Sequence, residues 1–263
     1  LVASKAGKAL AVVETGNLVF IEAEIDGNDV VVSGVLPSHT KETLSVYIPS
    51  WDVEAADYAT VVSKDDLLDK TEVYWKKLVA GSMQIDIPEP MLSDLIRASQ
   101  VHCFLAAREN QHGNLISPWI SADRYGPLES ESQAVIIGMD MIGQEEFARR
   151  SHDFFLAKYK PEGYMTTGYT LMGTGQHMMT LGKHYQLNQN DEWMEKAQPI
   201  MGKACEWIID QIEKNKNYYT NGEKCWDHGQ FPPGVYADWN RFAYHTYISA
   251  FYYGGLKEAT KAL

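Results

Sequence analysis

The chain is poor in cysteine and has no long hydrophobic run. Its three cysteines, Cys103, Cys205 and Cys225, are too few for a disulfide framework and form no Cys-x-x-Cys pair. Their odd number leaves at least one free thiol, so cysteine usage does not indicate a cellular compartment. No apolar stretch approaches the ~20 residues that a membrane-spanning helix needs. We therefore expect neither a disulfide scaffold nor a membrane-embedded protein.

Positive charge is also scarce. The chain has 23 Lys and Arg against 35 Asp and Glu, which gives a net charge of −12. This balance argues against nucleic acid or an anionic membrane as the main partner and favours a neutral or weakly charged substrate. With 263 residues, 45% of them hydrophobic, the chain is long enough for two domains or for one large toroid or barrel.

Several catalytic signatures are missing. The sequence contains no HExxH, GxSxG, P-loop or GxGxxG motif, which argues against zincins, α/β-hydrolases and the common nucleotide-binding folds. An Asp65-Asp66-x-x-Asp69 run matches a magnesium motif, but an acidic first helical turn explains it better. Cys225-Trp226-Asp227-His228 resembles one edge of a zinc site without a partner pair. We expect no metal site and no required cofactor.

The first 70 residues have the pattern of an antiparallel β region. Short runs such as Leu18-Val19-Phe20-Ile21 and Val30-Val31-Val32 are separated by Asp26-Gly27-Asn28, and Thr15-Gly16-Asn17 precedes the first of them. Gly and Asn between β-branched runs are typical of hairpins, because Gly tolerates positive φ. We expect residues 1–70 to form a region like part of a β-sandwich.

From about residue 88 the pattern becomes helical. Pro88-Glu89-Pro90 suits a helix start, and Gly143 suits a helix end. The pattern predicts six helices, at about 88–109, 129–142, 144–159, 167–185, 191–214 and from 238 to the C-terminus.

Charge alternates along these helices. The third and fifth are amphipathic and highly charged, whereas the second, fourth and sixth carry almost no charge. A helix that is apolar all round must be buried all round, so we expect two layers with the uncharged helices inside. Links after the inner helices are short, whereas residues 110–128 and 215–237 form long links. Antiparallel succession then places the long loops at one rim, beside the N-termini of the inner helices.

These features resemble the six-hairpin (α/α)6 toroid of glycoside hydrolases, of the rhamnosidase and glucoamylase kind. The resemblance rests on the rim-like segments 85–89, 121–133 and 231–239 and on the preceding β region. It implies a mainly α chain whose residues 71–263 form an incomplete toroid, about half of one, since six helices are present instead of twelve. The missing half would come from the same polypeptide or a partner chain. We then expect uncovered apolar flanks on the first and sixth helices.

Glycoside hydrolysis by such an enzyme uses two carboxyl groups, one as proton donor and one to activate water or attack carbon. The rim offers Asp123, Glu129, Glu131 and Asp238. Asp123-Arg124-Tyr125-Gly126 matches the acidic-Arg-x-Gly segment of rhamnosidase-like relatives, so Asp123 is the first candidate for the proton donor. Helix-terminal roles are the competing explanation for Glu129, Glu131 and Asp238.

A carbohydrate substrate also needs hydroxyl-binding and stacking side chains. The candidates, in chain order, are Trp119, Arg124, Tyr125, Tyr169, His177, Trp226, His228 and Trp239. A histidine such as His177, on an inner helix, is more often a satisfied core residue. A polysaccharide lyase that uses Tyr, His and Arg, and a non-catalytic glycan-binding or assembly protein, are the alternative functions.

Overall fold

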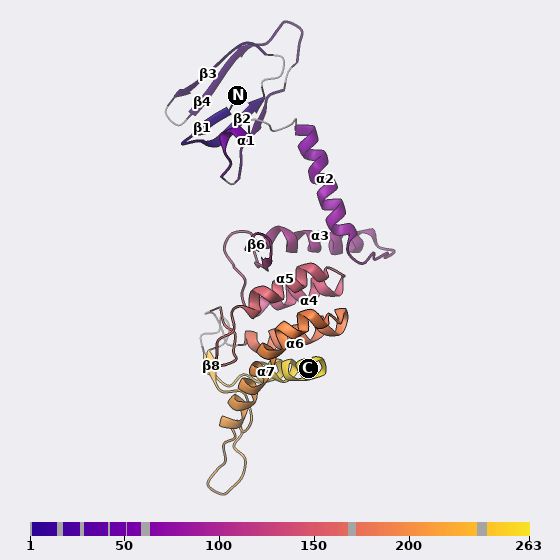
Figure 1. Ribbon diagram of the computed structural model, residues 1–263, viewed down its shortest axis with the longest axis vertical. Helices are drawn as coiled ribbons and strands as arrows, with labels where there is room; N and C mark the ends of the chain where they lie inside the picture. The colour runs from indigo at the N-terminus through magenta and orange to yellow at the C-terminus, as the bar shows by residue number, and fades with distance from the viewer. Residues whose placement is uncertain are drawn as a thin grey trace. The chain divides into compact units, whose positions relative to one another are not determined.

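The computed structural model describes residues 2–14, 18–26, 29–41, 43–50, 52–58, 64–167, 172–235 and 241–263 (Figure 1). The chain divides into two compact units, Leu1–Lys76 and Lys77–Leu263. The division falls within helix α2 (Lys64–Ala80), a few residues beyond the boundary that the sequence suggests. About half of the structure is helical, so the mainly α class is observed.

The first unit contains the antiparallel strands that the sequence predicts. A three-stranded sheet has the order β1-β2-β5, and β3 and β4 form a separate hairpin in which Asp26 pairs with Asp29. Its buried apolar residues are Ala9, Val12 and Val13 of β2. The elements are β1 (Val2–Lys5), β2 (Lys8–Glu14), β3 (Val19–Asp26), β4 (Asp29–Val35), β5 (Ser45–Tyr47) and the short helix α1 (Ala55–Tyr58).

Asp69, in the acidic run at the start of α2, is exposed on the helix surface. Asp66 pairs with Lys70 one turn later, with the two atoms 2.7 Å apart. Such an i,i+4 pair contributes only a few tenths of a kcal/mol to helix stability, roughly 0.3–0.5 kcal/mol. This pairing fits the interpretation of the run as an acidic helix start.

The described part of the second unit contains six long helices, which are joined by short links or by longer segments that carry small hairpins. Helix α7 has the predicted bounds. Helix α6 begins at Gly173 and α8 at Thr246, later than predicted: Thr167 lies outside α6, and the strand Phe242–Ala243 precedes α8. The elements are α3 (Pro90–Ala106), β6 (Arg108–Asn110), β7 (Leu115–Ser117), α4 (Glu131–Met141), α5 (Glu145–Leu156), α6 (Gly173–Asn188), α7 (Asp191–Lys214), β8 (Gly234–Val235), β9 (Phe242–Ala243) and α8 (Thr246–Ala262).

Local chemistry explains where these helices begin and end. Pro90 occupies the first turn of α3, where its missing N–H costs no intrahelical hydrogen bond. After α4, Gly143 adopts φ +88° and donates its N–H to the carbonyl of Asp140 at 2.9 Å. Positive φ favours Gly at this position, and it ends the helix. At the start of α7, the Asn190 side chain accepts a hydrogen bond from the N–H of Trp193 at 3.0 Å.

Helices α4, α6 and α8 run parallel to one another. Thr180 on α6 donates to Gln133 on α4 at 2.8 Å, and His184, one turn further along α6, lies 2.9 Å from Asp140, two turns further along α4. On the other side of α6, Gly175 faces Tyr252 of α8 and Gly182 faces Glu258. The three helices therefore begin at one end of the unit, and the loops that contain β6 and β8 lie at that same end (Figure 1). The expectation that both long loops share a rim is confirmed for their described residues.

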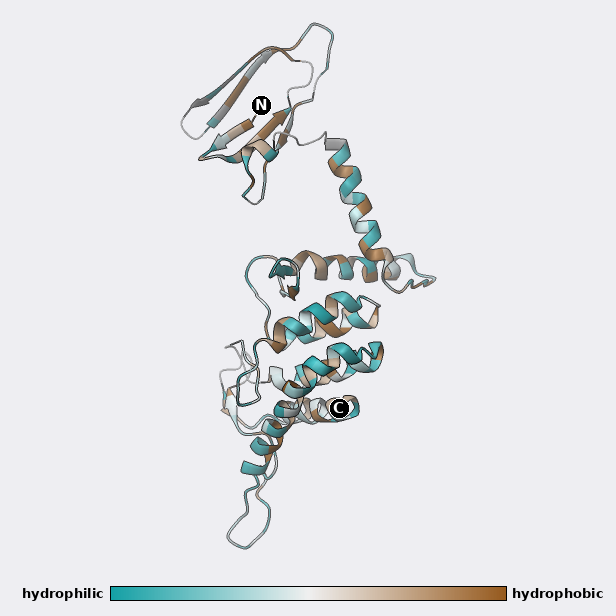
Figure 2. Ribbon diagram, viewed as in Figure 1, coloured by the Kyte–Doolittle hydropathy of each residue, from teal (hydrophilic) through white to brown (hydrophobic). Residues whose placement is uncertain are grey.

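Helices α5 and α7 run in the opposite direction and are amphipathic (Figure 2). Helix α5 buries Phe147, Ala148 and Phe155 and keeps Glu146 in solvent, whereas Arg149 and Arg150 are partly buried. The indole N–H of Trp193 on α7 donates to the Asp153 carboxylate on α5 at 2.9 Å, which ties the two helices together. The expected pairing of charged outer helices with uncharged inner ones is observed here.

Helix α6 is buried along almost its whole length, and its contact with α8 is unusually close. A Cβ atom built on Gly175 would lie 2.9 Å from the backbone of Phe251 and Tyr252. On Gly182 it would lie 2.4 Å from the carbonyl oxygen of Glu258, and on Gly255 2.4 Å from that of Gly175. Only glycine permits this approach, because the obstructing atoms are backbone.

The two helices at the edges of the unit keep apolar side chains in solvent, as expected. On α3, Met91 is 78% exposed and Leu95 60%, and on α8 Tyr253 is 68% exposed. Between α3 and α4 lies an apolar groove of about 300 Å³, with Leu95 and Cys103 on one side and Gly138 on the other. Among the described helices, none is long and apolar enough to cross a membrane.

Candidate functional site

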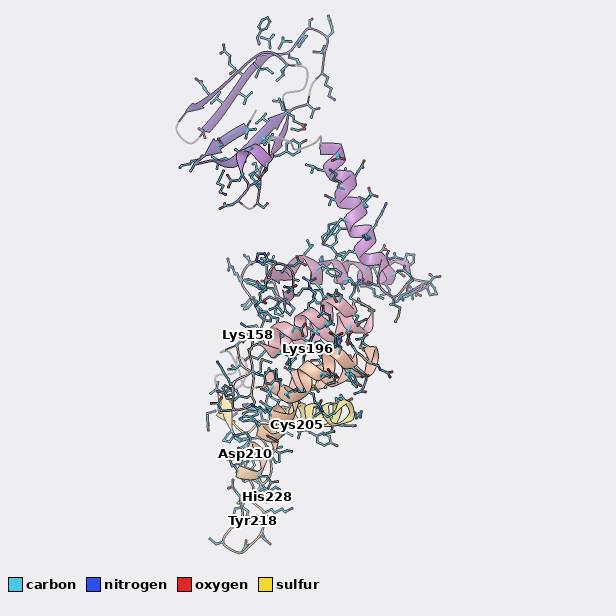
Figure 3. All side chains as sticks on the ribbon, in the orientation of Figure 1. Lys158, Lys196, Cys205, Asp210, Tyr218 and His228 are labelled. Atoms are coloured by element: carbon cyan, nitrogen blue, oxygen red, sulfur yellow. The ribbon has the colours of Figure 1, made fainter. Side chains whose placement is uncertain are left out.

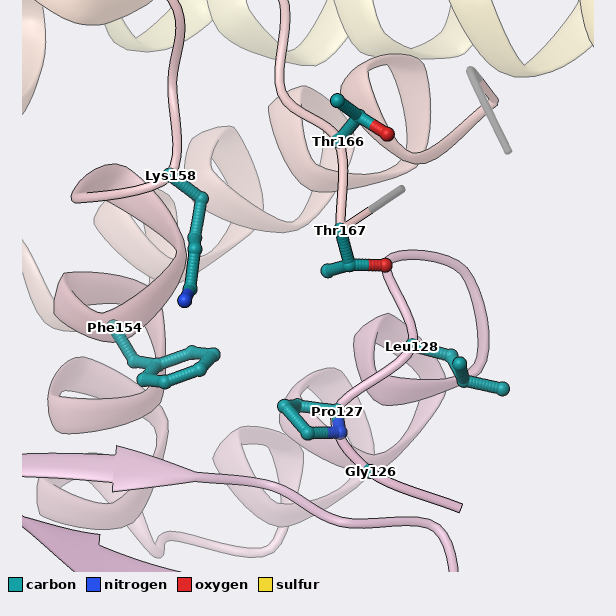
Figure 4. A pocket seen from close by; sticks show the side chains of 7 residues that line it. All are labelled: Gly126, Pro127, Leu128, Phe154, Lys158, Thr166 and Thr167. Atoms are coloured by element: carbon teal, nitrogen blue, oxygen red, sulfur yellow. The ribbon is translucent and has the colours of Figure 1, made fainter. Parts of the chain in front are cut away.

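A cavity of about 540 Å³ opens at the end of the second unit where α4 and α6 begin (Figure 4). Three segments build it: the loop before α4, the last turn of α5 with Lys158 two residues beyond it, and residues 166–167 before α6. Its lining residues are Gly126, Pro127, Leu128, Phe154, Lys158, Thr166 and Thr167. The cavity therefore lies at the rim where the sequence predicts the functional loops.

A buried carboxylate stands directly behind this cavity. Glu129 is fully buried, and it accepts hydrogen bonds from the Thr167 hydroxyl and, at 3.3 Å, from the Thr167 N–H. Gly173 permits this position, because a Cβ on that glycine would lie 2.3 Å from the Cβ of Glu129. Glu129 thus joins the start of α4 to the start of α6. It fixes a threonine whose side chain faces the cavity.

The wall that α5 contributes carries an aromatic ring and a cation. The Lys158 ammonium lies 4.7 Å from the centroid of the Phe154 ring, and Figure 4 shows the lysine side chain descending towards that ring across from Thr167. A cation over an aromatic face is held by the ring quadrupole, with about 0.5–1 kcal/mol at exposed sites. Of the lining residues that the structure describes, Lys158 alone is charged.

The loop that carries Asp123 is folded but open to solvent. The Ser121 hydroxyl accepts hydrogen bonds from the N–H groups of Arg124, at 3.3 Å, and Tyr125, at 3.2 Å. Asp123 and Arg124 pair at 3.7 Å, with side chains 77% and 84% exposed. Asp123 is three residues from Gly126 at the cavity edge, although its side chain is not part of the lining.

Trp119 supports the same loop from below. Its indole is half-buried, and the Arg108 guanidinium lies 5.0 Å from the ring centroid. A Cβ on Gly126 would contact the other part of this indole at 3.9 Å. Trp119 therefore holds the edge of the cavity, whereas Tyr125 is 62% exposed.

His177 lies in the core rather than in the cavity. It is fully buried, with Nε2 3.2 Å from His152 Nδ1 and Nδ1 3.1 Å from the Tyr159 hydroxyl. The His152 ring also lies 5.0 Å from the ring of His184, whose Nδ1 is 2.9 Å from the Asp140 carboxylate. These residues form a buried polar cluster between α4, α5 and α6.

Two histidines of this cluster, His152 and His177, have lowered pKa values and are neutral at neutral pH. Burial lowers the pKa of His177 to about 3. Burial also lowers the pKa of His152 well below 6.5, and the neighbouring His177 and His184 lower it further. The Nε2 atoms of His152 and His184 have no hydrogen-bond partner in the structure. Each added proton would place a charge in a site that disfavours it.

The loop after α7 carries two further candidates and stands apart from the cavity lining (Figure 3). Trp226 is 70% exposed and makes an edge contact with Tyr244, with ring centroids 5.0 Å apart. His228 donates from Nδ1 to the carbonyl of Asn217 at 2.8 Å and packs against Tyr218. The motif Cys225–His228 is therefore part of loop packing.

Asp227 in the same loop is held by its neighbours. A hydrogen bond from Tyr244 lowers the pKa of Asp227, and a second one from Asn217 adds to the effect. The Asn215 side chain donates to the Asp227 carbonyl at 3.0 Å. These contacts give the loop a defined conformation without a bound ion. Among the described residues, no group of His, Cys, Asp and Glu has the arrangement of a metal site.

The structure brings together some of the sequence-predicted residues and not others. Glu129 lies behind the cavity, and Glu131 is exposed in the first turn of α4, where it accepts from Ser130. Tyr169, Asp238 and Trp239 lie outside the described residues. The shared cleft that we expect between the segments of Asp123 and Asp238 therefore stays a prediction.

Sequence reasoning missed three cavity residues, Phe154, Lys158 and Thr166. The first two belong to the charged helix α5 and its end, which the pattern indicates as an outer element. Their contribution to the rim depends on the short connection from α5 to α6, in which Met165 donates its N–H to Thr174 at 2.9 Å. The sequence offered one signal for these cavity residues, which is a lysine just after the end of an amphipathic helix and close to Phe154. Comparison with family models, with curated proteins and with solved structures finds no match for this chain.

Proposed function

We propose that the second unit is the rim-bearing part of an (α/α)6 toroid glycoside hydrolase and that the cavity before α4 and α6 binds a sugar. This proposal rests on one observation. The parallel helices α4, α6 and α8 begin at the same end of the unit, and that end holds a cavity of about 540 Å³ and the buried carboxylate of Glu129. Small-ligand sites typically have volumes of roughly 300–1,000 Å³, so the cavity has room for one or two sugar rings.

The cavity chemistry suits a sugar. The Phe154 ring offers an apolar face to pyranose C–H groups. The Thr167 hydroxyl donates its own proton to Glu129, so its lone pairs remain to accept a hydrogen bond from a ligand hydroxyl. Lys158 adds donors on the opposite wall. An apolar surface with a few fixed polar groups is the usual composition of such sites.

Two carboxylates have distinct roles in this proposal. Asp123 remains the proposed proton donor, carried by a loop that ends at the cavity edge. Its present pairing with Arg124 and its exposure mean that the loop must close over substrate to exclude water. Glu129 is proposed as a positioning residue, which orients Thr167 towards the ligand.

The uncovered edges of the unit support an incomplete ring. Apolar side chains on α3 and α8 are exposed at the two flanks, where a closed toroid would place neighbouring helices. We propose that further helices, from the same polypeptide or a partner chain, complete the ring and supply the second reacting carboxylate where Asp238 does not.

The test uses the polypeptide in which this chain occurs, with a broad panel of chromogenic glycosides. Asp123→Asn should lower kcat by 10²-fold or more while KM changes little, because proton donation matters mainly in the transition state. Glu129→Gln should raise KM more than it lowers kcat. Glu145→Gln, in the first turn of α5 at the opposite end, is the matched control and should change neither. Wild-type turnover in the Asp123 variant would remove this residue from the mechanism.

Glycan binding without catalysis is the second candidate. The exposure of Asp123 favours it, because a carboxylate in open solvent is poorly placed to donate a proton within a closed site. If sugars bind at the cavity and no glycoside in the panel is cleaved, this candidate replaces the hydrolase. A lyase has less support, since the described lining contains no Tyr, His or Arg.

A further inference from the structure

The charge of the cavity lining indicates the chemical class of the ligand more narrowly than the shape of the cavity does. Among the described lining residues Lys158 alone is charged, in a chain whose net charge is −12. Its ammonium lies over the Phe154 ring and forms no ion pair within the part of the chain that the structure describes. An unpaired cation at a cavity wall attracts one negative group of a ligand.

We propose that the cavity prefers a sugar that carries one carboxylate, a uronic acid, whose carboxylate pairs with Lys158 while a ring hydroxyl donates to Thr167. This proposal rests on the proposed function, because it names the substrate class of the same cavity. The two walls supply complementary groups: the Lys158 ammonium from the end of α5 and, across from it, Thr167 from the segment before α6 (Figure 4). A sugar acid presents the matching anion and hydroxyl donor on one small ring.

The placement of the lysine favours a single carboxylate over a polyanion. One ammonium compensates one negative charge, and no second Lys or Arg lines the described cavity. A phosphate or sulfate ester would need further donors to replace its hydration. The acidic chain also repels polyanions at long range, although this repulsion is screened beyond about 10 Å at 0.1 M salt. A short-range contact to Lys158 is therefore consistent with the overall charge.

The ring of Phe154 strengthens this preference. It occupies one side of the Lys158 ammonium and displaces water there. A partly desolvated cation gains more from a carboxylate than a fully hydrated one does. The ring then faces the pyranose C–H groups of the same ligand.

The experiment is an NMR titration of the polypeptide with matched sugar pairs: glucuronic acid against glucose, and galacturonic acid against galactose. The backbone amides of Gly126, Leu128 and Thr167 report binding at the cavity. We expect a uronic acid of at least one pair to bind about tenfold or more tightly than its neutral partner, since a charge-assisted hydrogen bond is roughly twice as strong as a neutral one. The preference should shrink between 20 mM and 500 mM salt.

Two lysine variants separate the cavity from general surface charge. Lys158→Met should abolish the preference, so that the uronic acid and its neutral partner bind equally. Lys160→Met, two residues away and outside the lining, should keep the preference intact. Both side chains are exposed, so neither change should disturb the fold, and far-UV circular dichroism checks this.

The outcomes distinguish the two proposals. Equal binding of the acid and the neutral sugar overturns the uronic acid preference and leaves the sugar site standing. Binding of acetate as tight as that of the uronic acid overturns the assignment to a sugar acid. If none of the four sugars shifts the cavity amides, the sugar site itself fails.

Discussion

The two sides of the inner helix layer differ sharply in how closely they are packed. Between α6 and α8 the backbones approach so closely that glycines are required at three positions, and α6 is buried almost throughout. Between α3 and α4 an apolar groove of about 300 Å³ remains, and no atom lies within 4 Å of a Cβ built on Gly138. Glycine therefore permits close packing between α6 and α8, whereas at Gly138 it leaves open space beside the groove.

This difference shows that low charge in a helix does not by itself indicate burial on every side. Lack of charge in α4, α6 and α8 predicts burial, yet only α6 has neighbours on every side. Helix α4 buries Ile136 and Met139 against its neighbours and leaves Gly138 and Met141 exposed. Under the proposed function the exposed sides face helices that complete the ring.

The largest expected effect tests the closely packed contact between α6 and α8, which we call the close side. Gly182→Ala places a methyl group 2.4 Å from the carbonyl oxygen of Glu258, so α6 and α8 must separate. Overpacking typically costs 1–3 kcal/mol, and we expect about 3 kcal/mol here because backbone cannot move aside as a side chain can. Urea denaturation of the polypeptide measures this change.

Gly202→Ala in α7 is the matched control. Nothing lies within 4 Å of its Cβ position, so helix propensity should make this variant slightly more stable, by up to about 1 kcal/mol. Equal stability of the Gly182→Ala variant and the wild type would show that the α6–α8 crossing is looser than described.

The second effect is a loss of stability in acid, which comes from His152 and His177 in the buried cluster between α4, α5 and α6. The pKa of His177 is lowered to about 3 and that of His152 well below 6.5, whereas both titrate near 6.5 when unfolded. The unfolded chain therefore binds more protons as the pH falls below 6.5. Each histidine should cost up to about 1.4 kcal/mol per pH unit, until the pH reaches its folded pKa.

Urea midpoints between pH 7.5 and pH 5 measure this dependence. A His177→Gln variant should show a shallower slope below pH 6.5, whatever its stability at pH 7.5. His228→Gln, a change of an exposed loop histidine, should keep the wild-type slope. Identical slopes for all three proteins would show that His177 gains its proton without unfolding.

The difference in predictability between fold and site follows from the range of the interactions. Periodicity and Gly143 are local signals, so helix order, the parallel inner helices and the bounds of α7 could be predicted. The late start of α8 could not, because Phe242 and Ala243 before it look helical in sequence but form one strand of a small hairpin. The contact of Glu129 with Thr167 joins residues 38 positions apart, and no local pattern encodes it.

The third effect concerns this contact, which closes the rim between α4 and α6. Thr167→Val removes a hydroxyl that donates to the buried carboxylate of Glu129. Loss of one hydrogen bond to a buried charged group should cost about 1.5–3 kcal/mol. We expect an unfolding change near the low end, because the Thr167 N–H still donates to Glu129 at 3.3 Å.

Thr167→Ser, which retains the hydroxyl, is the control for this substitution and should recover most of the stability. If Val and Ser variants lose stability equally, the methyl group of Thr167, rather than its hydroxyl, is the stabilising part.

The smallest effect tests the open side, which is the groove between α3 and α4. Gly138→Ala adds a methyl group to the exposed face of α4, beside the groove, with nothing within 4 Å of it. Ala is favoured over Gly inside a helix by roughly 0.8–1.0 kcal/mol, so this variant of the isolated chain should gain up to about that much stability. Urea denaturation in parallel with Gly182→Ala gives opposite signs if the two sides differ as described. A loss of stability in Gly138→Ala would mean that α3 and α4 pack together in solution, and the open side would then be as closed as the other.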